Sequence, residues 1–327
     1  MIENKIILLF GGTGSLGNEF VKRYINNNII YNYSRDECKH WQMKLDFNHN
    51  NNNLQFIIGD VINKHKVEES ILRIKPNIIV IASAMKHIDQ CEYNTDQSLN
   101  TNLLGVKNIL DIVELHKNEL VGFLETVLFV SSDKACSPIN VYGMCKALSE
   151  TLIIEKSHYI KDFKFVNIRY GNVLNSRGSI IPLLHTIGKD PNKQYFTLTN
   201  ENMTRFVMTL EQSVDLIEHT ILHGKSGDTV VPKLISMKVK DLVEIFSEIY
   251  NKPIKNIGLK PGEKLLESLI NHSQSGRIEK NKDYTHIKSI FNFKEEIIES
   301  ILCDYNSKIN PLNKDDLKMY LSELKLI

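Results

Sequence analysis

The feature that most constrains the fold is a series of six short apolar runs in the first half of the chain. They are KIILLF (5–10), IIYNYS (29–34), QFIIGD (55–60), NIIVIASA (77–84), ETVLFVSS (125–132) and FKFVNIRY (163–170). Helical stretches, including 95–117 and 139–157, lie between these runs. Strands of nearly continuous Ile and Val that alternate with helices indicate a parallel sheet covered by helices on both faces.

The sequence GGTGSLG (11–17) follows the first run directly and opens a helix. Glycine permits a tight turn close to a pyrophosphate, and the helix N-terminus offers free N–H groups to it. A glycine triplet alone fits a structural turn equally well, but the strand–loop–helix context predicts dinucleotide binding. We therefore expect an α/β fold, a Rossmann-type doubly wound parallel sheet. The loop residues expected at the cofactor are Gly11, Thr13, Gly14, Ser15, Leu16 and Gly17.

The end of the second run bears on the choice of cofactor. An acid there would bind the ribose 2′-hydroxyl of NAD, whereas this chain has Ser34-Arg35-Asp36 with Lys39 close behind. Arg35 can pair with a 2′-phosphate and stack on adenine, so we expect NADP, with NAD possible. The alternative, that Arg35 is only a surface charge, stays open. Further along the cofactor we expect Asp60, Val61, Ala82 and Lys86.

The second half of the chain is more irregular and is interrupted by several prolines. We expect residues 1–172 to form the dinucleotide-binding domain. Residues 173–327 are expected to be a smaller, mainly substrate-binding part that interleaves with the first. The tail, 271–327, is rich in Lys, Glu and Asn and is interpreted as peripheral helices.

Composition excludes several classes of function. A formal net charge of +1 offers no basic excess for nucleic acid. No apolar run approaches the roughly 18 residues of a membrane helix, and the N-terminus does not resemble a secretion signal. The five cysteines show no paired spacing, which predicts reduced thiols in the cytoplasm. His219 and His223 have zinc-compatible spacing but no third ligand nearby, so we expect a solvated helix end and no metal.

Tyr142 and Lys146 lie one helical turn apart and therefore share a helix face. A free tyrosine has a pKa of about 10, and lowering it to 7 requires about 4 kcal/mol. A neighbouring ammonium and a positive nicotinamide ring both favour the phenolate. With Ser132 bound to the same substrate hydroxyl, the set predicts oxidation of an alcohol by proton removal and hydride transfer. A coincidental spacing on an ordinary helix is the alternative.

The motifs GGTGSLG, YSRDE, IGDV, TN (101–102), SDKA, YGMCK and RYGNV, in this order, resemble the extended short-chain dehydrogenase/reductases. More narrowly, SDKA…INVYGMCK, NVLNSRGSIIP, MTRF, VPKLISMKVKDL and KPGEK resemble the inverting UDP-N-acetylglucosamine 4,6-dehydratases, over about residues 5–270. The most specific element is Asp133-Lys134. Retaining hexose 4,6-dehydratases carry a glutamate where this chain has Lys134, and plain 4-epimerases lack the acid/base pair.

This resemblance implies NADP-dependent 4,6-dehydration of UDP-N-acetylglucosamine with inversion at C5, giving a UDP-4-keto-6-deoxy-L-amino sugar. It implies Lys134 as the base at C5 and Asp133 as the acid at C6, although a proton shared by coupled groups leaves the reverse assignment open. Both side chains can reach one sugar only if the strand has ended before residue 133, because strand neighbours point to opposite faces. The competing hypotheses are a nucleotide-sugar epimerase or reductase and a non-catalytic dinucleotide-sensing scaffold.

The same resemblance implies further contacts and an assembly. Val173 and Asn102 are expected at the cofactor, and Lys86 at both cofactor and sugar. The residues expected at the nucleotide sugar are Asn172, Arg177, Arg205, Lys260 and Glu263. The family usually has arginine where this chain has Lys260, which keeps the charge but lacks the forked guanidinium. A homo-oligomer, at least a dimer, is expected.

Overall fold

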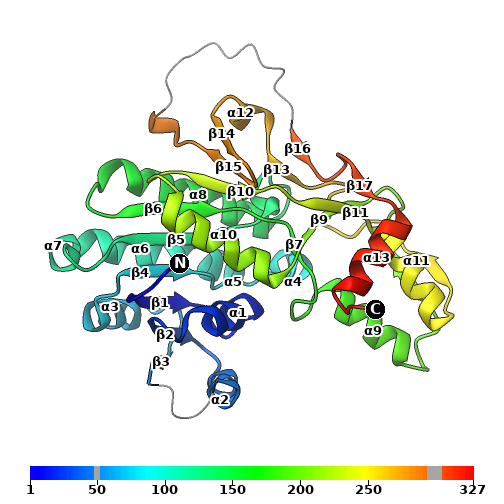
Figure 1. Cartoon of the computed structure of the whole chain (residues 1–327), viewed down its shortest axis with the longest axis horizontal. Helices are drawn as coiled ribbons and strands as arrows, with labels where there is room; N and C mark the ends of the chain where they lie inside the picture. Colours follow the sequence, from blue (N-terminus) through cyan, green and yellow to red (C-terminus); the bar gives the residue numbers. More distant parts are fainter. Residues whose placement is uncertain (48–51, 293–303) are drawn as a thin grey trace.

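The computed structural model describes residues 1–47, 52–292 and 304–327, so Cys303 lies outside the described residues. Nine of the described strands form one sheet (Figure 1). In spatial order they are β14 (Ile278–Asn281), β15 (Tyr284–Ile287), β10 (Thr229–Pro232), β6 (Lys164–Ile168), β5 (Thr126–Val130), β4 (Ile78–Ile81), β1 (Ile6–Phe10), β2 (Ile29–Ser34) and β3 (Leu54–Ile58). Within this spatial order, the strands β10, β6, β5, β4, β1, β2 and β3 are parallel. The strands β15 and β14 add to β10 in antiparallel pairs at the edge of the sheet. All six predicted apolar runs are confirmed as strands.

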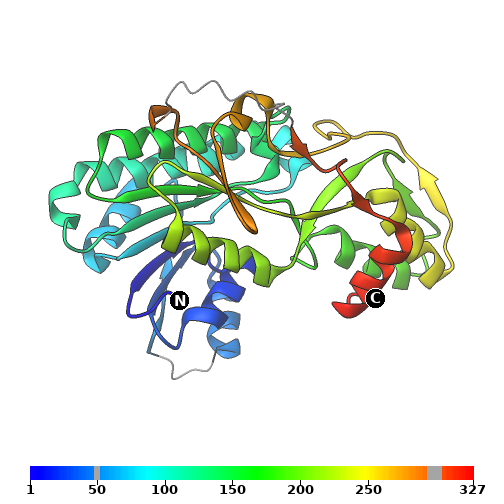
Figure 2. The ribbon, with the colours of Figure 1, turned by 45° about the horizontal axis from the view of Figure 1, so that its top comes forward.

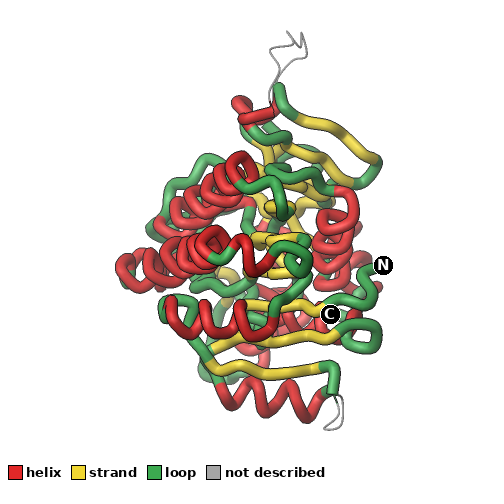
Figure 3. Tube along the Cα trace, turned by 90° about the vertical axis from the view of Figure 1, so that its left-hand side faces the viewer, coloured by secondary structure: helices red, strands yellow, loops and turns green. Residues whose placement is uncertain are grey.

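The apolar runs are continuous because both faces of the sheet are covered. In β1, Leu8 and Phe10 pack into one core, while Ile7 and Leu9 pack into the other. Figure 3 shows the strands between two layers of helices. One layer contains α3 (Lys64–Ile74), α6 (Gly105–Leu115) and α8 (Val141–Tyr159). The opposite layer contains α1 (Ser15–Tyr24), α2 (Glu37–Asp46) and α10 (Leu210–His223). The predicted doubly wound sheet is confirmed.

The predicted helix at 95–117 is continuous but irregular. It consists of α5 (Thr95–Leu99), a π-helical turn η1 (Asn100–Leu104) and α6, whereas the predicted helix at 139–157 corresponds to α8. No helix among the described residues is long and apolar enough to cross a membrane. The shorter elements around this core are α4 (Ile88–Tyr93), α7 (Lys117–Leu120), η2 (Asp133–Ala135), α12 (His272–Ser275) and η3 (Ile290–Asn292).

A smaller body lies beyond the carboxyl ends of the parallel strands (Figures 1 and 2). Its sheet joins β17 (Pro311–Leu312), β11 (Ile235–Lys238), β9 (Thr204–Met208) and β7 (Asn172–Val173). Its helices are α9 (Ile180–Lys189), α11 (Val239–Tyr250) and α13 (Lys314–Glu323). Two further strand pairs belong to this region. The pair of β8 (Phe196–Leu198) and β12 (Ile254–Asn256) packs on the core of the smaller body. The pair of β13 (Ser268–Ile270) and β16 (Tyr305–Asn306) lies where the smaller body meets the large sheet. Phe196, Phe246 and Leu317 fill its core.

The interpretation of the tail as peripheral helices is wrong. Residues after 271 supply β14 and β15 to the large sheet and β17 to the smaller one, and only α13 and the short α12 and η3 are helical among its described residues. Because β14 lies at an exposed edge, it needs few apolar residues, and its Glu and Lys resemble those of a surface helix. Strands from both sides of residue 172 share the large sheet, and a domain boundary there stays a prediction.

The hairpin β14–β15 also corrects the expectation of a solvated helix end for His219, whereas His223, the last residue of α10, is exposed as expected. The ring of His219 stacks on Tyr284 with centroids 3.9 Å apart, and its Nε2 lies 3.0 Å from Nε2 of His286. His219 is therefore covered by the tail and is not at a solvated helix end. Within the described part of the chain, no group of three or more His, Cys, Asp or Glu residues could hold a metal ion.

Candidate active site

The glycine loop between β1 and α1 has the geometry that a pyrophosphate requires. Gly11 has φ +85°, and a Cβ on it would lie 2.6 Å from the amide nitrogen of Ser83. A Cβ on Gly17 would lie 2.1 Å from the carbonyl oxygen of Gly12, so only glycine allows α1 to pack this close to the strand. Gly14 precedes α1 without a side-chain cap, which leaves the N–H groups of the first turn to a ligand. The buried hydroxyl of Ser83 also has no hydrogen-bond partner. The site therefore fits a dinucleotide.

In the segment that follows β2, Arg35 carries a positive charge that remains accessible. Asp36 caps α2 by accepting a hydrogen bond from the Lys39 amide at 3.0 Å, and its carboxylate pairs with the Lys39 ammonium at 2.6 Å. Arg35, whose side chain is 55% exposed, lies 3.4 Å from a carboxylate oxygen of Asp60. The acid next to Arg35 is therefore occupied locally, and the guanidinium remains accessible to a ligand.

Two hydroxyl groups join this region to the glycine loop. Thr13 donates to the Ser34 hydroxyl at 3.1 Å, and Ser34 Oγ lies 2.7 Å from Nε2 of the buried His40. Val61 is buried behind Asp60, and the partly buried Leu16 packs on the apolar core. These hydrogen bonds and apolar contacts fix the residues around the predicted cofactor site.

The side chain of Asn102 fixes the loop after β4 by binding the backbone of Met85. Its amide oxygen accepts a hydrogen bond from the Met85 amide at 2.8 Å, and its nitrogen donates to the Met85 carbonyl at 3.0 Å. The π-helical turn η1 carries Asn102, which is fully buried. The side chain predicted to contact the cofactor therefore fixes the backbone beside Lys86. Ala82 follows β4 directly, and its amide extends the pairing with β1 by donating to the Phe10 carbonyl at 2.9 Å.

The loop after β7 crosses the glycine loop. The Arg177 amide donates to the Ser15 hydroxyl at 2.9 Å, and the Arg177 carbonyl accepts from the Lys86 ammonium at 2.5 Å. The backbone of Arg177 thus bridges two predicted cofactor residues, while its own side chain is exposed. Val173, in β7, pairs with Met208 of β9 at the same junction.

Tyr142 and Lys146 project from the first turns of α8 into the end of β5. The Lys146 ammonium donates to the Val130 carbonyl at 2.7 Å and lies 4.4 Å from the ring centre of Phe129. Burial lowers the pKa of Lys146 to about 8. Burial, Tyr170 and Asp133 raise the pKa of Tyr142, whereas Ser132 lowers it. Without a cofactor, burial therefore favours the neutral phenol, and the expectation that the ammonium and the nicotinamide ring together favour the phenolate stays a prediction.

Strand β5 ends at Val130, and Asp133 and Lys134 lie in the following 3₁₀ turn η2. The expectation that the strand has ended before residue 133 is therefore confirmed. Oδ1 of Asp133 accepts from the Ser132 hydroxyl at 2.9 Å and from the Lys134 ammonium at 3.0 Å. The ammonium also donates to the Asn172 amide oxygen at 3.3 Å. The broken strand thus brings four predicted residues, from η2 and β7, into one hydrogen-bonded group.

A residue that the sequence analysis missed completes this group. Oε1 of Glu267 lies 3.8 Å from the Lys134 ammonium, and Glu267 is 1% exposed. Burial by itself lowers the pKa of Lys134, but Asp133 and Glu267 outweigh it and the net direction is upward. Burial alone therefore does not release the proton of Lys134. Glu267 follows the KPGEK motif by a few positions, and nothing local in the sequence distinguishes it from a surface acid.

The remaining predicted substrate residues are only partly brought to this group. Arg205, in β9, is buried, and its guanidinium donates to the carbonyls of Thr204 and Lys264 at 2.8 and 2.9 Å. Lys260 is exposed, and its amide donates to the Glu263 carboxylate at 3.0 Å within one turn. Glu263 therefore shapes its own turn. The same turn is joined to α8, because the Gly262 carbonyl accepts from the Asn140 amide group at 2.8 Å.

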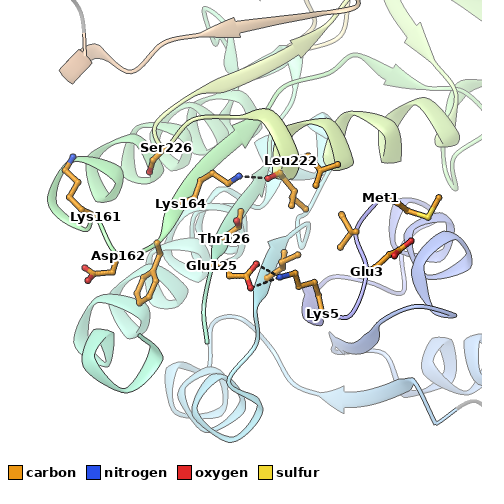
Figure 4. Close-up of a pocket in the computed structure, with 14 residues that line it drawn as sticks. Met1, Glu3, Lys5, Glu125, Thr126, Lys161, Asp162, Lys164, Leu222 and Ser226 are labelled. Carbon is orange, nitrogen blue, oxygen red and sulfur yellow. Dashed lines mark hydrogen bonds and ion pairs between the residues drawn. The ribbon is translucent and has the colours of Figure 1, made fainter. Parts of the chain in front are cut away.

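A surface pocket lies at the amino-terminal ends of the parallel strands, at the other end of the sheet from the site described above (Figure 4). Lys5 and Glu125 face each other there at 2.6 Å, and Lys164 donates to the Ile221 carbonyl. These three charged groups are therefore already paired with protein groups. Ligands of open parallel sheets bind beyond the carboxyl ends of the strands, so this pocket does not belong to the site.

Comparisons with known proteins agree with this geometry. The model of the polysaccharide biosynthesis protein family matches residues 7–289. The chain is 34% identical to a UDP-glucose 4-epimerase of Rickettsia rickettsii, over 100% of this chain and 98% of that protein. It is 33% identical to a UDP-glucose 4-epimerase of Rickettsia bellii over the same shares.

Solved structures give the same picture of the fold. The structure of Pen from Bacillus thuringiensis has a TM-score of 0.90 at 30% identity and covers 99% of both chains. A dTDP-glucose 4,6-dehydratase of Streptomyces venezuelae, DesIV, has a TM-score of 0.66 at 16% identity and covers 80% of this chain and 86% of that one. The chain belongs to the polysaccharide biosynthesis protein family, and its sequence relatives include nucleotide-sugar epimerases.

Proposed function

We propose that this protein is an NADP-dependent UDP-N-acetylglucosamine 4,6-dehydratase that inverts C5. The observation that carries the proposal is the buried pair Asp133–Lys134, whose carboxylate and ammonium are 3.0 Å apart next to Ser132. Oδ2 of Asp133 is buried and has no hydrogen-bond partner. A buried polar atom that lacks a partner costs stability, so it supports a group reserved for a ligand.

The protein's own residues would divide the proton transfers among them. Tyr142, supported by Ser132, would take the proton of the sugar 4-hydroxyl. Lys134, once neutral, would remove the C5 proton that the 4-keto group acidifies, and Asp133 would protonate the departing C6 hydroxyl to give water. Protonation of C5 from the opposite face would then invert it. When bound, the nicotinamide supplies positive charge beside the phenol, accepts the C4 hydride and returns it at C6.

The charges at the end of β2 support NADP. Arg35 is accessible and can pair with a 2′-phosphate, whereas Asp36 is paired with Lys39 at 2.6 Å. The structural neighbour DesIV has NAD bound, so similarity of fold does not itself favour NADP and the proposal depends on the local charges of this chain.

A second candidate is a nucleotide-sugar 4-epimerase, because the Rickettsia relatives are named UDP-glucose 4-epimerases. Epimerisation at C4 needs Ser132, Tyr142 and Lys146 but no second acid and base. The interacting Asp133 and Lys134 therefore favour the dehydratase. A scaffold that only senses the dinucleotide is disfavoured by the same ionisable groups.

One experiment separates these functions. The purified protein, loaded with NADP⁺, is incubated with UDP-N-acetylglucosamine in deuterated water, and the sugar is followed by NMR. A dehydratase gives a 6-methyl signal and deuterium at C5. A product inverted at C4 that keeps its C6 hydroxyl would establish the epimerase, and an unchanged sugar would exclude both for this substrate.

We also infer that the protein pairs through α8 and the neighbouring helix. Met144 and Leu148 on α8 are exposed, as are Leu99 and Leu104 next to it. Exposed apolar side chains that gather on adjacent helices favour association. Light scattering on the protein and on a Leu148→Glu variant tests this: a dimer or larger assembly that the variant weakens is expected.

A further inference from the structure

Glu267 is held rigidly behind the acid/base pair, although no step of the proposed reaction uses it. Its amide donates to the Ser307 hydroxyl at 3.0 Å, and its carbonyl accepts from the Ser307 amide at 2.8 Å. The Ser307 hydroxyl also lies 2.8 Å from the hydroxyl of Thr204 in β9. Backbone bonds therefore fix this position, which leaves the carboxylate free of any task in holding the chain.

The carboxylate of Glu267 lies between two ammonium groups. Oε1 is 3.8 Å from Nζ of Lys134, and Oε2 is 3.6 Å from Nζ of Lys264. Oε2 is buried and has no hydrogen-bond partner. A buried carboxylate with ion pairs of this length is a poor way to stabilise a fold, because desolvation offsets most of the attraction. Its geometry is better suited to acting on the charge of Lys134.

We propose that Glu267 is a positioning residue that keeps Lys134 in its ammonium form beside Asp133 and thereby determines the pH above which Lys134 can accept the C5 proton. The inference rests on the proposed function, because it assigns Lys134 as the base. A base must be neutral before it acts, and a nearby carboxylate opposes that neutral form. Glu267 therefore tunes the proton-accepting group without touching the substrate.

The charged surroundings define the sign of the effect. Lys134 faces Asp133 from η2, Glu267 from the segment before β13, and Arg205 from β9. Glu267 in turn faces Lys134, Asp133, Arg205 and Lys264. Burial lowers the pKa of Lys134, Asp133 and Glu267 raise it, Arg205 lowers it, and the net direction is upward. Loss of the Glu267 charge must then lower this pKa.

Two variants that each remove one charge test the proposal with opposite signs. Glu267→Gln keeps the volume and removes the negative charge, so the limb on which kcat for UDP-N-acetylglucosamine rises with pH should move down by about one pH unit. Lys264→Gln removes the second ammonium beside Glu267, so that Glu267 acts on Lys134 alone. The Gln amide can still donate to the Cys136 carbonyl, which Lys264 binds at 2.9 Å in the wild-type protein. In this variant the same limb of kcat should move to higher pH, by a smaller amount. Glu267→Asp, which preserves the charge, should restore a limb near that of the wild-type protein.

A surface control and a measurement without turnover complete the test. Glu201→Gln, which removes an exposed carboxylate paired with Lys240, should leave the limb in place. In protein labelled with ¹³C-lysine and free of substrate, the Cε signal of Lys134, assigned by its loss in Lys134→Arg, reports its titration directly. Its midpoint should fall in Glu267→Gln. This measurement stands even if UDP-N-acetylglucosamine is not turned over, which would refute the proposed function alone.

The proposal is overturned if the Lys134 midpoint is the same in wild-type protein and Glu267→Gln. It is also overturned if that midpoint falls while the limb of kcat stays in place, because Lys134 protonation would then not govern turnover. A merely structural Glu267 would lower the free energy of unfolding in all three variants and would not move the two limbs in opposite directions.

Discussion

Two clusters of buried charge in this protein differ in how fully hydrogen bonds satisfy them. Beyond the carboxyl ends of the parallel strands, the inner cluster of Asp133 and Glu267 is nearly inaccessible, and each carboxylate has one oxygen without a hydrogen-bond partner. The outer cluster lies beside the edge hairpin β14–β15. There Asp228 is equally buried, but its carboxylate accepts from the Lys225 amide at 3.1 Å and from Lys288 at 3.2 Å. Nδ1 of His286 lies 3.2 Å from the same oxygen.

This difference distinguishes a site from a structural network. An unsatisfied buried polar group destabilises the fold, and a chain retains it only where another requirement acts on it. A satisfied network fixes the elements that contribute to it. Asp228 joins the start of β10 to β15, so the outer cluster holds the tail hairpin in the sheet. The inner cluster leaves acceptor positions for a ligand.

The largest effect should come from Lys134→Ala. Removing a general base typically lowers kcat by about 10²–10⁴-fold, and NADP binding should persist because the glycine loop is untouched. The 6-methyl signal by NMR and the fluorescence of bound NADPH measure the two properties. Lys288→Ala, which removes an ammonium from the outer carboxylate, is the matched control and should keep its turnover. Full activity of Lys134→Ala would contradict the distinction between the clusters.

The reverse pattern is expected at the outer cluster. Asp228→Ala leaves His286 and Lys288 without their shared acceptor and should lower the free energy of unfolding by about 3 kcal/mol, with kcat of the folded protein unchanged. Asp133→Asn should abolish turnover with a change in stability below about 1 kcal/mol, because the amide oxygen of Asn can still accept from Ser132 and Lys134 and Glu267 still faces the ammonium. Urea unfolding and steady-state rates measure both. A large stability loss in Asp133→Asn would show that both clusters are structural.

The comparison extends to Arg35, an exposed cation that is only loosely paired. Arg35→Ala should raise the Kd of NADPH about tenfold and leave that of NADH nearly unchanged, since only NADPH carries the 2′-phosphate. Titration calorimetry gives both constants. Lys22→Ala on α1, which removes another exposed cation, serves as the control. Equal weakening of the two dinucleotides would argue against NADP selection at Arg35.

The smallest effect concerns acid stability at the outer edge. Burial, His286 and His223 lower the pKa of His219 from 6.5 to about 4. Between these two values the unfolded chain binds more protons than the folded one, so stability falls as the pH drops from 6.5 to 4. His219→Phe keeps the ring contact with Tyr284 and should reduce that loss, as measured by urea midpoints over the window. The exposed His65→Gln should not, and identical slopes for His219→Phe and wild type would refute the assignment.

Local patterns predicted much of the fold and part of the site. The six strands and the glycine loop follow from short segments, because burial on both faces requires continuous apolar residues and the phosphate turn requires glycine. Ser132, Asp133, Lys134 and Tyr142 are close in sequence and carry a recognisable spacing. The edge hairpin β14–β15 could not be predicted, because an exposed edge strand tolerates the same polar residues as a helix.

The order of residues alone determined the parallel sheet and the dinucleotide loop, and it supplied the proposal of Asp133 and Lys134 as an acid/base pair, since each depends on residues within a few positions. Only the tertiary structure decided that Glu267 faces Lys134 and that the backbone of Arg177 spans the glycine loop. It also decided that Asn102 supports Met85 and that the tail closes the sheet. The physical reason is that burial and charge act through distance in space, and Lys134 and Glu267 come within 3.8 Å only after two sheets have packed together.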